Sequence, residues 1–348
     1  MKAYRGAMWS VLLLAAMLAS ACSNDPPPEV NEPTDPPPGQ TETEPEETPD
    51  PEAEDEAIIR AFREEIRQAE SAGELIAFLD EHLSRASGEA ADVLFLELEA
   101  YYAEDLPKTQ GLFLMNEVQE KFSIMGDPTT VTEITDLELR EMARRAESGH
   151  YVLVQMEGEV YPIIDYTALE KYSPLLSQEL RDYLQLMAME TEHQKKGEPD
   201  SAHTLDGLAE RAVTAEQYLE RYPDGLKRED VLEGYAARME RLLFGMANGP
   251  RFDLDNGVIY DDYLQAFQRI SQRHGATYTG SLVQRFVELL GESDQKIIIV
   301  SADDRRDVPA IAELRDGLAE EIRKKYGAED VEAIDADEPE GAEDAENS

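Results

Sequence analysis

The spacing of apolar residues between positions 57 and 326 constrains the fold of this chain more than any other feature of the sequence. Apolar side chains recur there every three or four residues, which places them on one face of an α-helix. Such stripes must pack against one another, so the sequence predicts a mainly α fold of about ten helices, most of them short. The stripes are Ile58, Phe62 and Ile66; Leu75, Leu79 and Leu83; Leu114, Val118 and Phe122; Leu232, Tyr235, Met239 and Leu242; Tyr263, Phe267, Ile270 and His274; and Leu314, Leu318 and Ile322.

Residues that typically begin and end helices flank these stripes. A Thr followed three residues later by Glu is typical of a capping box, in which both side chains bond to backbone amides of the first turn. Proline suits the first helical position, and glycine suits the end of a helix. The sequence offers Thr135 with Glu138 and Thr167 with Glu170 as capping boxes, Pro309 as a first helical residue, and Gly275, Gly291 and Gly327 as helix ends.

One stretch breaks the helical period. Residues 150–166 read HYVLVQMEGEVYPIIDY, are rich in β-branched and aromatic residues, and carry Glu157-Gly158 at their centre. This pattern predicts a β-hairpin with a two-residue turn, inserted into the helical array. Pro162 has no backbone N–H to donate, which suits an edge strand.

A two-residue turn fixes which side chains of the hairpin share a face. Both sets are largely apolar, so we expect other elements to cover the hairpin on both sides. The first set is Val152, Val154, Met156, Tyr161 and Ile163, and the second is Tyr151, Leu153, Val160 and Ile164. Residues 296–302 (KIIIVSA) fit a third strand and a buried helical turn almost equally well, and both interpretations stay open.

A pattern of paired helices recurs along the chain. Residues 215–225 (AEQYLERYPDG) precede a second apolar stripe, and 78–94 and 267–290 have a similar layout. The middle unit resembles the tetratricopeptide-like hairpins of envelope lipoproteins, where a Tyr-Pro turn joins two helices, and this resemblance implies an array of helical hairpins. The polar loop at 195–202 separates 57–194 from 203–326, which form two α-helical domains or one continuous domain.

The N-terminal segment has the layout of an export signal. Two basic residues precede Ala7–Ala21, an apolar run too short to cross a bilayer, and small residues then lead to Cys22, the only cysteine. This segment resembles the signal peptides of bacterial lipoproteins, although Leu18 stands one residue earlier than is usual and Ala19 takes its place. The resemblance implies removal of residues 1–21, acylation of Cys22, and anchoring in a bacterial cell membrane with the chain facing outside the cytoplasm.

Two further segments have the composition of disordered chain. Residues 23–56 hold ten of the nineteen prolines and thirteen acids without a base. Such a segment buries little apolar surface and its charges repel, so the sequence predicts a disordered tether over 22–56. The tail, 327–348, holds ten acids and no base, and we expect it to be disordered as well.

The charge of the chain excludes one class of partner. The sequence carries 76 acidic and 32 basic side chains, a net charge of −44. Residues 57–326 hold 53 of the acids and 30 of the bases, so the region of helical stripes is acidic as well. Nucleic-acid binding depends on basic side chains that displace counterions from phosphates, so the sequence predicts no nucleic-acid partner.

Histidines and acids do not form a complete metal-binding pattern. Glu147 with His150 and Glu190 with His193 have the i, i+3 spacing of di-iron bundles, but both pairs fall at expected helix ends, which favours solvated positions. His193 and His203 flank a polar loop without further histidine ligands nearby in the sequence. The sequence therefore predicts no metal and no cofactor.

No complete catalytic motif occurs either. Ser293 and Lys296 have the Ser-x-x-Lys spacing of penicillin-binding enzymes, but the Ser-Asp-Asn and Lys-Thr-Gly elements of that family are missing. The acidic loop at 253–262 departs from a calcium-binding loop at the glycine position and at the final ligand. We therefore expect no catalytic residue.

Tyrosines are the remaining chemical feature. A tyrosine combines an apolar ring with a polar tip, so such a group can pack a hairpin against helices, the interpretation we favour, or grip a ligand. The cluster near the predicted hairpin is Tyr151, Tyr161, Tyr166, Tyr172 and Tyr183.

These features favour a membrane-anchored lipoprotein of the cell envelope whose α-helical domain binds a protein or peptide, or serves as a structural module, without catalysis. The alternative is a receptor for a small ligand or ion, with a pocket between hairpin and helices that uses Tyr161, Asp165 and Tyr166. An enzyme of a kind that spacing does not reveal is the third hypothesis. An exposed apolar surface would favour the first hypothesis, a tyrosine-lined pocket the second, and a buried titratable cluster the third.

Overall fold

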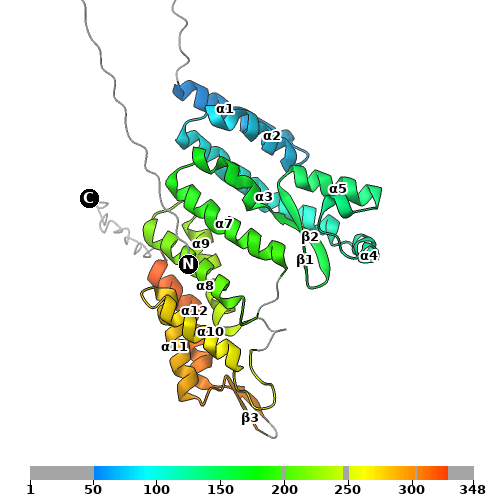
Figure 1. Cartoon of the computed structure of the whole chain (residues 1–348). Helices are drawn as coiled ribbons and strands as arrows, with labels where there is room; N and C mark the ends of the chain where they lie inside the picture. The colour runs from blue at the N-terminus through cyan, green and yellow to red at the C-terminus, as the bar shows by residue number, and fades with distance from the viewer. Residues whose placement is uncertain (1–50, 198–200, 246–250, 302–303, 328–348) are drawn as a thin grey trace, which may run out of the picture. The chain divides into compact units, whose positions relative to one another are not determined.

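The apolar stripes correspond to helices in a computed structural model, which describes residues 51–197, 201–245, 251–301 and 304–327 (Figure 1). These residues form twelve α-helices and two small antiparallel sheets, which confirms the predicted mainly α fold with a β-hairpin insertion. The predicted signal peptide, Cys22, the tether up to residue 50 and the acidic tail beyond Gly327 lie outside the described residues.

The first part of the described chain surrounds the β-hairpin with helices. The long helix α3 packs against α1, α2 and the strand β2, and α5 and α7 pack against β1. The elements are α1 (Pro51–Gln68), α2 (Ala72–His82), η1 (Leu83–Arg85), α3 (Gly88–Phe113), α4 (Asn116–Met125), η2 (Val131–Glu133), α5 (Leu137–Ser148), β1 (Tyr151–Met156), β2 (Glu159–Ile164), α6 (Tyr166–Leu169), η3 (Glu170–Leu175) and α7 (Gln178–Lys196), where η marks a short 3-10 helix.

The second part consists mainly of consecutive helices that pack in pairs. Helix α8 packs against α9, and α10 against α11, as expected for helical hairpins. The last helix, α12, packs against α9 and α11. The elements are α8 (Leu205–Arg221), α9 (Arg228–Phe244), α10 (Asp261–Arg273), α11 (Tyr278–Glu292), β3 (Ile298–Val300), β4 (Arg305–Asp307) and α12 (Pro309–Tyr326).

Most of the predicted stripes face the hydrophobic core. All residues of the stripes that begin at Leu75, Leu232 and Leu314 are buried. Leu114 differs, because α3 continues to Phe113 and Leu114 follows as its C-cap instead of belonging to α4, so its side chain is 38% exposed. The stripe was therefore right for the residues within α4 and wrong at its first position.

The first helix begins earlier than the sequence suggested. Helix α1 starts at Pro51, inside the segment expected to be a tether, and proline suits a first helical turn. Acidic residues near its start also have partners on η1 and at the N-cap of α3. Glu54 accepts a hydrogen bond from Arg85 at 2.7 Å, and Asp55 accepts one from the backbone amide of Ser87 at 2.9 Å. These contacts fix residues that their composition alone would leave unfolded.

The hairpin has the predicted register. Strands β1 and β2 pair antiparallel, with Val154 opposite Tyr161 and Leu153 opposite Pro162. The turn residues Glu157 and Gly158 both have positive φ, 53° and 87°, as a two-residue turn of type I′ requires. Buried side chains occur on both faces, so the expected double covering is confirmed.

Side chains from neighbouring helices cover the outer edge of β2. Gln119 of α4 donates to the carbonyl of Val160 at 2.7 Å and accepts from its amide at 3.0 Å. Gln110 of α3 donates to the carbonyl of Pro162 at 3.0 Å. Pro162 therefore lies on an edge strand, as predicted, and its neighbours on that edge still have hydrogen-bond partners.

The helix caps differ from the predicted ones by one or two residues. Asp136, instead of Thr135, caps α5 and accepts from the amide three residues later at 2.9 Å. Asp165, instead of Thr167, caps α6. Aspartate is among the best N-caps, and in both cases it stands directly before the first helical residue. Thr135 lies one position too early, and Thr167 lies inside α6. Pro309 is the first residue of α12, as predicted.

Two open points concern the second part of the chain. Residues 298–300 form β3, paired with β4, so the strand interpretation of 296–302 holds for these three residues. The division between 57–194 and 203–326 stays a prediction. Helices α7 and α8 pack across it, and the buried Glu99 of α3 lies 2.7 Å from Lys227 at the start of α9.

Candidate functional site

A pocket of about 710 Å³ lies between α3, α5, the start of α2 and β1. It is larger than the other two pockets described below. Its apolar lining is Ala72, Leu112, Phe113, Met142 and Ala146, together with the ring of Tyr151. A concave, mostly apolar surface of this size is typical of a binding site. We call it the α3–α5 pocket.

Two glycines let α2 and α5 approach closely beside this pocket. A Cβ on Gly149, at the end of α5, would lie 2.8 Å from the Cβ of Ala72. A Cβ on Gly73 would lie 2.5 Å from the Oγ of Ser148. A larger residue at either position would push the two helices apart, so the glycines set the spacing of two of the elements that line the pocket.

Asp105 organises the polar end of the α3–α5 pocket. Its Oδ2 accepts hydrogen bonds from the Tyr151 hydroxyl at 2.8 Å and from the Thr109 hydroxyl at 3.2 Å. Burial, and then the contact with Asp105, raises the pKa of Tyr151, which therefore stays a neutral hydrogen-bond donor. These three polar side chains bond to one another, and the apolar side chains form the rest of the lining.

Charged residues also line the α3–α5 pocket, and acids outnumber bases by two. The acids are Glu70, Asp105, Glu138 and Glu141, and the bases are Lys108 and Arg145. Arg145 donates to the backbone carbonyl of Glu70 at 2.5 Å, which ties α5 to the turn before α2. The charged residues that line the pocket therefore carry a net negative charge.

Exposed apolar side chains occur at the end of α3, on α4 and at the start of α5, and one of them, Leu112, also lines the α3–α5 pocket. Most of the large apolar side chains exposed in the described residues fall between positions 112 and 137. Lys121 of α4 lies 3.4 Å from Asp136 and 3.1 Å from Glu138, so it holds α4 against the start of α5. We call the following residues the apolar rim: Leu112, Leu114, Met115, Ile124 and Leu137.

Two of the three residues predicted to contact a ligand share a second pocket. Tyr161 and Tyr166 line a cavity of about 380 Å³ between the hairpin, α3 and α7, and Asp165 does not. The Tyr161 hydroxyl lies 3.2 Å from the sulfur of Met156. The Tyr166 hydroxyl donates to the buried Glu99 at 2.7 Å. Both polar tips therefore have partners within the protein.

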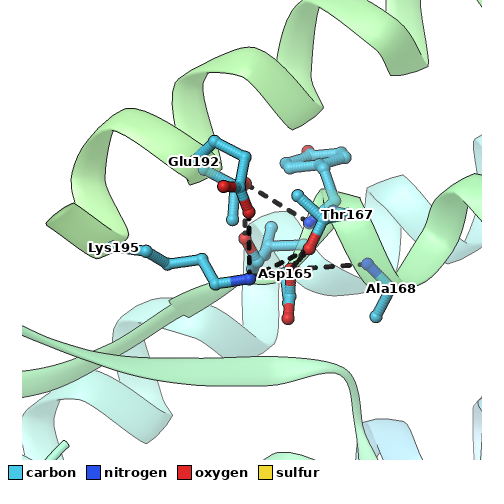
Figure 2. A network of polar contacts seen from close by, with 8 residues as sticks. Asp165, Thr167, Ala168, Glu192 and Lys195 are labelled. Atoms are coloured by element: carbon cyan, nitrogen blue, oxygen red, sulfur yellow. Dashed lines mark hydrogen bonds and ion pairs between the residues drawn. The ribbon is translucent and has the colours of Figure 1, made fainter.

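Asp165 lies instead in a polar network at the start of α6 (Figure 2). Its Oδ1 accepts from the backbone amides of Thr167 and Ala168 at 3.1 and 3.4 Å, and from the Thr167 hydroxyl. Lys195 of α7 lies 3.6 Å from Asp165 and 3.2 Å from Glu192, and donates to the Thr167 hydroxyl at 3.1 Å. Asp165 therefore acts as a helix cap that is tied to α7.

A buried titratable cluster joins α3, α6, α7 and the start of α9. Glu99 accepts from Tyr166 and forms an ion pair with Lys227, which lies over the ring of Tyr183. Burial lowers the pKa of Lys227, but Glu99 and Asp230 outweigh it and keep the lysine charged. Glu99 and Lys227 neutralise each other, and neither lines the pockets of the hairpin or of α3–α5. The cluster therefore ties α3 to α6 and to the start of α9.

The partial motifs of the sequence have structural roles. The position of Glu190 near a helix end suggested that it is solvated, and this expectation was wrong. Glu190 forms ion pairs with Arg211 and Arg238 and is largely buried. The Ser293 hydroxyl donates to the carbonyl of Lys296 at 2.8 Å within a turn. Among the residues that the structure describes, no group of three His, Cys, Asp or Glu could hold a metal ion.

No protein-family model, curated protein or solved structure matches this chain. Across the described ranges, no helix combines the length and the apolar content that crossing a membrane requires.

Sequence reasoning missed the apolar rim and the pocket beside it. Ile124 and Leu137 stand outside the apolar stripes of their helices, and this was the one signal that could have marked them as exposed. The pocket itself needs α3, α5 and β1 in contact, which the sequence alone does not give.

Proposed function

We propose that this chain is a lipid-anchored lipoprotein of the bacterial cell envelope whose helical domain binds a protein or peptide at the α3–α5 pocket and the apolar rim, without catalysis. The partner segment presents apolar side chains flanked by basic residues. The observation that carries the proposal is an apolar pocket with an exposed leucine in its lining, Leu112, together with further exposed apolar side chains on α4 and α5.

The exposure of the apolar rim supports a binding surface. Ile124 is 80% exposed and Leu137 is 77% exposed, so neither side chain belongs to the hydrophobic core. Burying one such side chain against a partner stabilises the complex by about 1.5–3 kcal/mol. Grouped exposed apolar side chains next to a cavity are a common feature of docking surfaces.

Charge complementarity selects the kind of partner. The acids lining the α3–α5 pocket outnumber the bases by two, and residues 57–326 hold 53 acids against 30 bases. A basic segment is attracted to this surface at low salt, whereas an acidic one is repelled. The same repulsion disfavours the acidic tail of this chain as the occupant. The pocket walls are mainly helices, so a partner helix would dock through side chains in a groove.

Two synthetic helical peptides with the same leucine face test the proposal. One carries lysine and the other glutamate at the remaining positions, and binding to the full chain is followed by fluorescence anisotropy at low and high salt. We expect the lysine peptide to bind and to lose affinity as salt rises, because screening weakens charge attraction. The glutamate peptide should bind at least about tenfold more weakly.

Matched variants locate the binding. Leu137→Asp in the apolar rim should weaken the lysine peptide by about tenfold or more, because it removes apolar contact and places a desolvated charge at the interface. Leu226→Asp changes a leucine that is also exposed, at 63%, but lies before α9 and outside this surface, and it should have no effect. If neither peptide binds, or if both variants bind alike, this surface is not a peptide site.

The receptor hypothesis remains the second candidate, because Tyr161 and Tyr166 do line one pocket beside the hairpin. It is less favoured, since that pocket is about half the size of the α3–α5 pocket and its tyrosine hydroxyls already have partners. Binding of a small molecule that is abolished by Tyr161→Ala, with the lysine peptide unaffected, would support this function.

A further inference from the structure

A third pocket, of about 490 Å³, lies between α7 and α8, beside the start of α6. It is separate from the α3–α5 pocket and from the hairpin pocket. Arg211, Gly207 and Ala188 lie on its inner side, where Arg211 and Ala188 are buried. The outer side carries Glu170, Glu192, Glu210, Lys196, His193 and His203.

Arg211 is buried without enough hydrogen-bond acceptors. The residue is only 5% exposed. Its Nε lies 3.2 Å from an oxygen of Glu190 but makes no hydrogen bond of normal geometry. Within the described part of the chain, its Nη1 and Nη2 groups donate no hydrogen bond to protein. Nε is buried and lacks such a bond, whereas Nη1 and Nη2 are not fully buried, so a ligand in the pocket can supply acceptors to them in place of water.

The charges behind the pocket do not cancel. Glu190 forms ion pairs with both Arg211 and Arg238, so one carboxylate faces two guanidinium groups. Burial, together with the positive charge of Arg238 and Arg241, lowers the pKa of Arg211 against the opposing effect of Glu190. A positive excess at a buried place, in a chain with a net charge of −44, calls for an anion.

Gly207 keeps the space in front of this guanidinium open. It lies one helical turn before Arg211 on α8, and both residues line the pocket. A Cβ on Gly207 would lie 3.6 Å from the Nη1 of Arg211, which is ordinary contact distance. A branched side chain at this position would therefore fill the space beside Nη1 without straining the backbone.

The outer side of the pocket has the opposite charge. Three carboxylates line it, together with Lys196. Ion pairs hold two of these acids in place. Glu192 lies 3.2 Å from Lys195, in the network at the start of α6 (Figure 2). Glu210 lies 2.8 Å from Arg273. The pocket therefore has a cationic inner end and an acidic outer end.

We propose that the α7–α8 pocket binds a small zwitterion, a free amino acid or a very short peptide, with its carboxylate on Arg211 and its ammonium group toward Glu170, Glu192 and Glu210. The planar guanidinium fork suits a carboxylate, which it binds through two parallel hydrogen bonds. A phosphate dianion fits less well, because the acidic outer side repels a second negative charge.

The test measures binding of the twenty common amino acids, and of dipeptides of the best one, to the full chain by isothermal titration calorimetry. We expect at least one free amino acid to bind. Its primary amide, which lacks the carboxylate, and its N-acetyl derivative, which lacks the ammonium group, should each bind roughly ten- to a hundredfold more weakly. Inorganic phosphate serves as the simple-anion probe and should not compete.

Three variants place the ligand. Arg211→Gln should abolish binding, and Gly207→Val should weaken it at least about tenfold by filling the space beside Nη1 while Arg211 is kept. Arg238→Gln removes the other arginine that pairs with Glu190 but does not line the pocket, so it should bind the amino acid far better than Arg211→Gln does. Circular dichroism establishes that each variant is folded.

Several outcomes overturn the inference. They are a panel without any binding, equal binding of the amide or the N-acetyl derivative, tight binding of phosphate, and unchanged binding by folded Gly207→Val. None of these outcomes affects the peptide proposal, because Leu137 and the α3–α5 pocket share no lining residue with this site.

Discussion

The hydroxyl of Tyr166 donates a hydrogen bond to Glu99 across 2.7 Å, although the two residues stand 67 positions apart and both are buried. The same carboxylate lies 2.7 Å from Lys227. One glutamate therefore joins α3 to α6 and to the start of α9. Other tyrosines use acids in the same way, as Tyr172 does with Asp80 and Tyr218 with Glu179. Part of the acidic excess of the chain is thus structural.

Replacing this glutamate should destabilise the fold. Glu99→Gln removes the buried one of the two carboxylates that lie 2.7 Å from Lys227, and breaking such a buried pair costs about 3 kcal/mol. Urea unfolding of the full chain, followed by circular dichroism, measures the change. Glu229→Gln is the control, because Glu229 also lies beside a basic residue but is 73% exposed, so it should change stability by less than about 0.5 kcal/mol. Equal effects of the two variants would mean that the buried pair does not hold these helices.

Alkaline pH should unfold the protein through its buried tyrosines. Burial, and then the nearby Glu99, raises the pKa of Tyr166 well above its ordinary value of 10.0, and the pKa of Tyr183 is raised for the same two reasons. The fold therefore favours the neutral form. The contribution to stability is complete below about pH 10, where unfolded tyrosine is neutral too, and it falls as the pH rises above that value.

Tyrosinate absorbance and urea midpoints along a pH series measure this effect. We expect the absorbance of several tyrosines to appear late and together with unfolding. Tyr166→Phe removes one of the groups concerned, so its stability should depend less steeply on pH above about pH 10 than that of the unaltered chain. A smooth titration of all tyrosines in the folded state would contradict the prediction.

Removing the side chain of Gln119, which covers the edge of the hairpin, should also lower the stability of the fold. Gln119→Ala leaves both the amide and the carbonyl of Val160 without their partner, at a cost of about 2 kcal/mol. Gln284→Ala removes an exposed glutamine whose amide bonds only to a neighbouring side chain of the same helix, so it should cost less than about 0.5 kcal/mol. Thermal melting of both variants compares them, and similar losses would show that the Gln119 contacts add no stability.

The proposed lipid anchor depends on Cys22. Cys22→Ser should prevent incorporation of an alkyne-labelled fatty acid in a bacterial host and move the protein from the membrane fraction to the soluble fraction. Ser23→Ala, one position further on, keeps the cysteine and should stay labelled and membrane-bound. Labelling of the Cys22→Ser chain would contradict acylation at this residue.

Local patterns predicted the local part of this structure. The stripe at Leu75, Leu79 and Leu83 marked a buried helical face, and Glu157-Gly158 marked the turn of the hairpin, because both depend on residues within a few positions of one another. The caps were harder, since Thr135 and Asp136 compete for the same role and only the backbone path decides which one bonds to the helix.

The candidate sites depend on distant residues and were therefore out of reach of the sequence. Asp105 meets Tyr151 across 46 positions. Arg211 of α8 and Arg238 of α9 share Glu190 of α7 only because these helices pack side by side. Asp165 was expected to contact a ligand because of its neighbours in the sequence, and the structure uses it as a helix cap.

Gln119 and Gln110 beside β2 affect how readily copies of the protein can aggregate through this strand edge. An open strand edge is a template on which a second copy of a protein can build an intermolecular sheet and aggregate. Gln119 and Gln110 already occupy backbone groups of Val160 and Pro162 along that edge. In a crowded solution a second copy would find those backbone groups already bonded, which hinders the addition of a strand there.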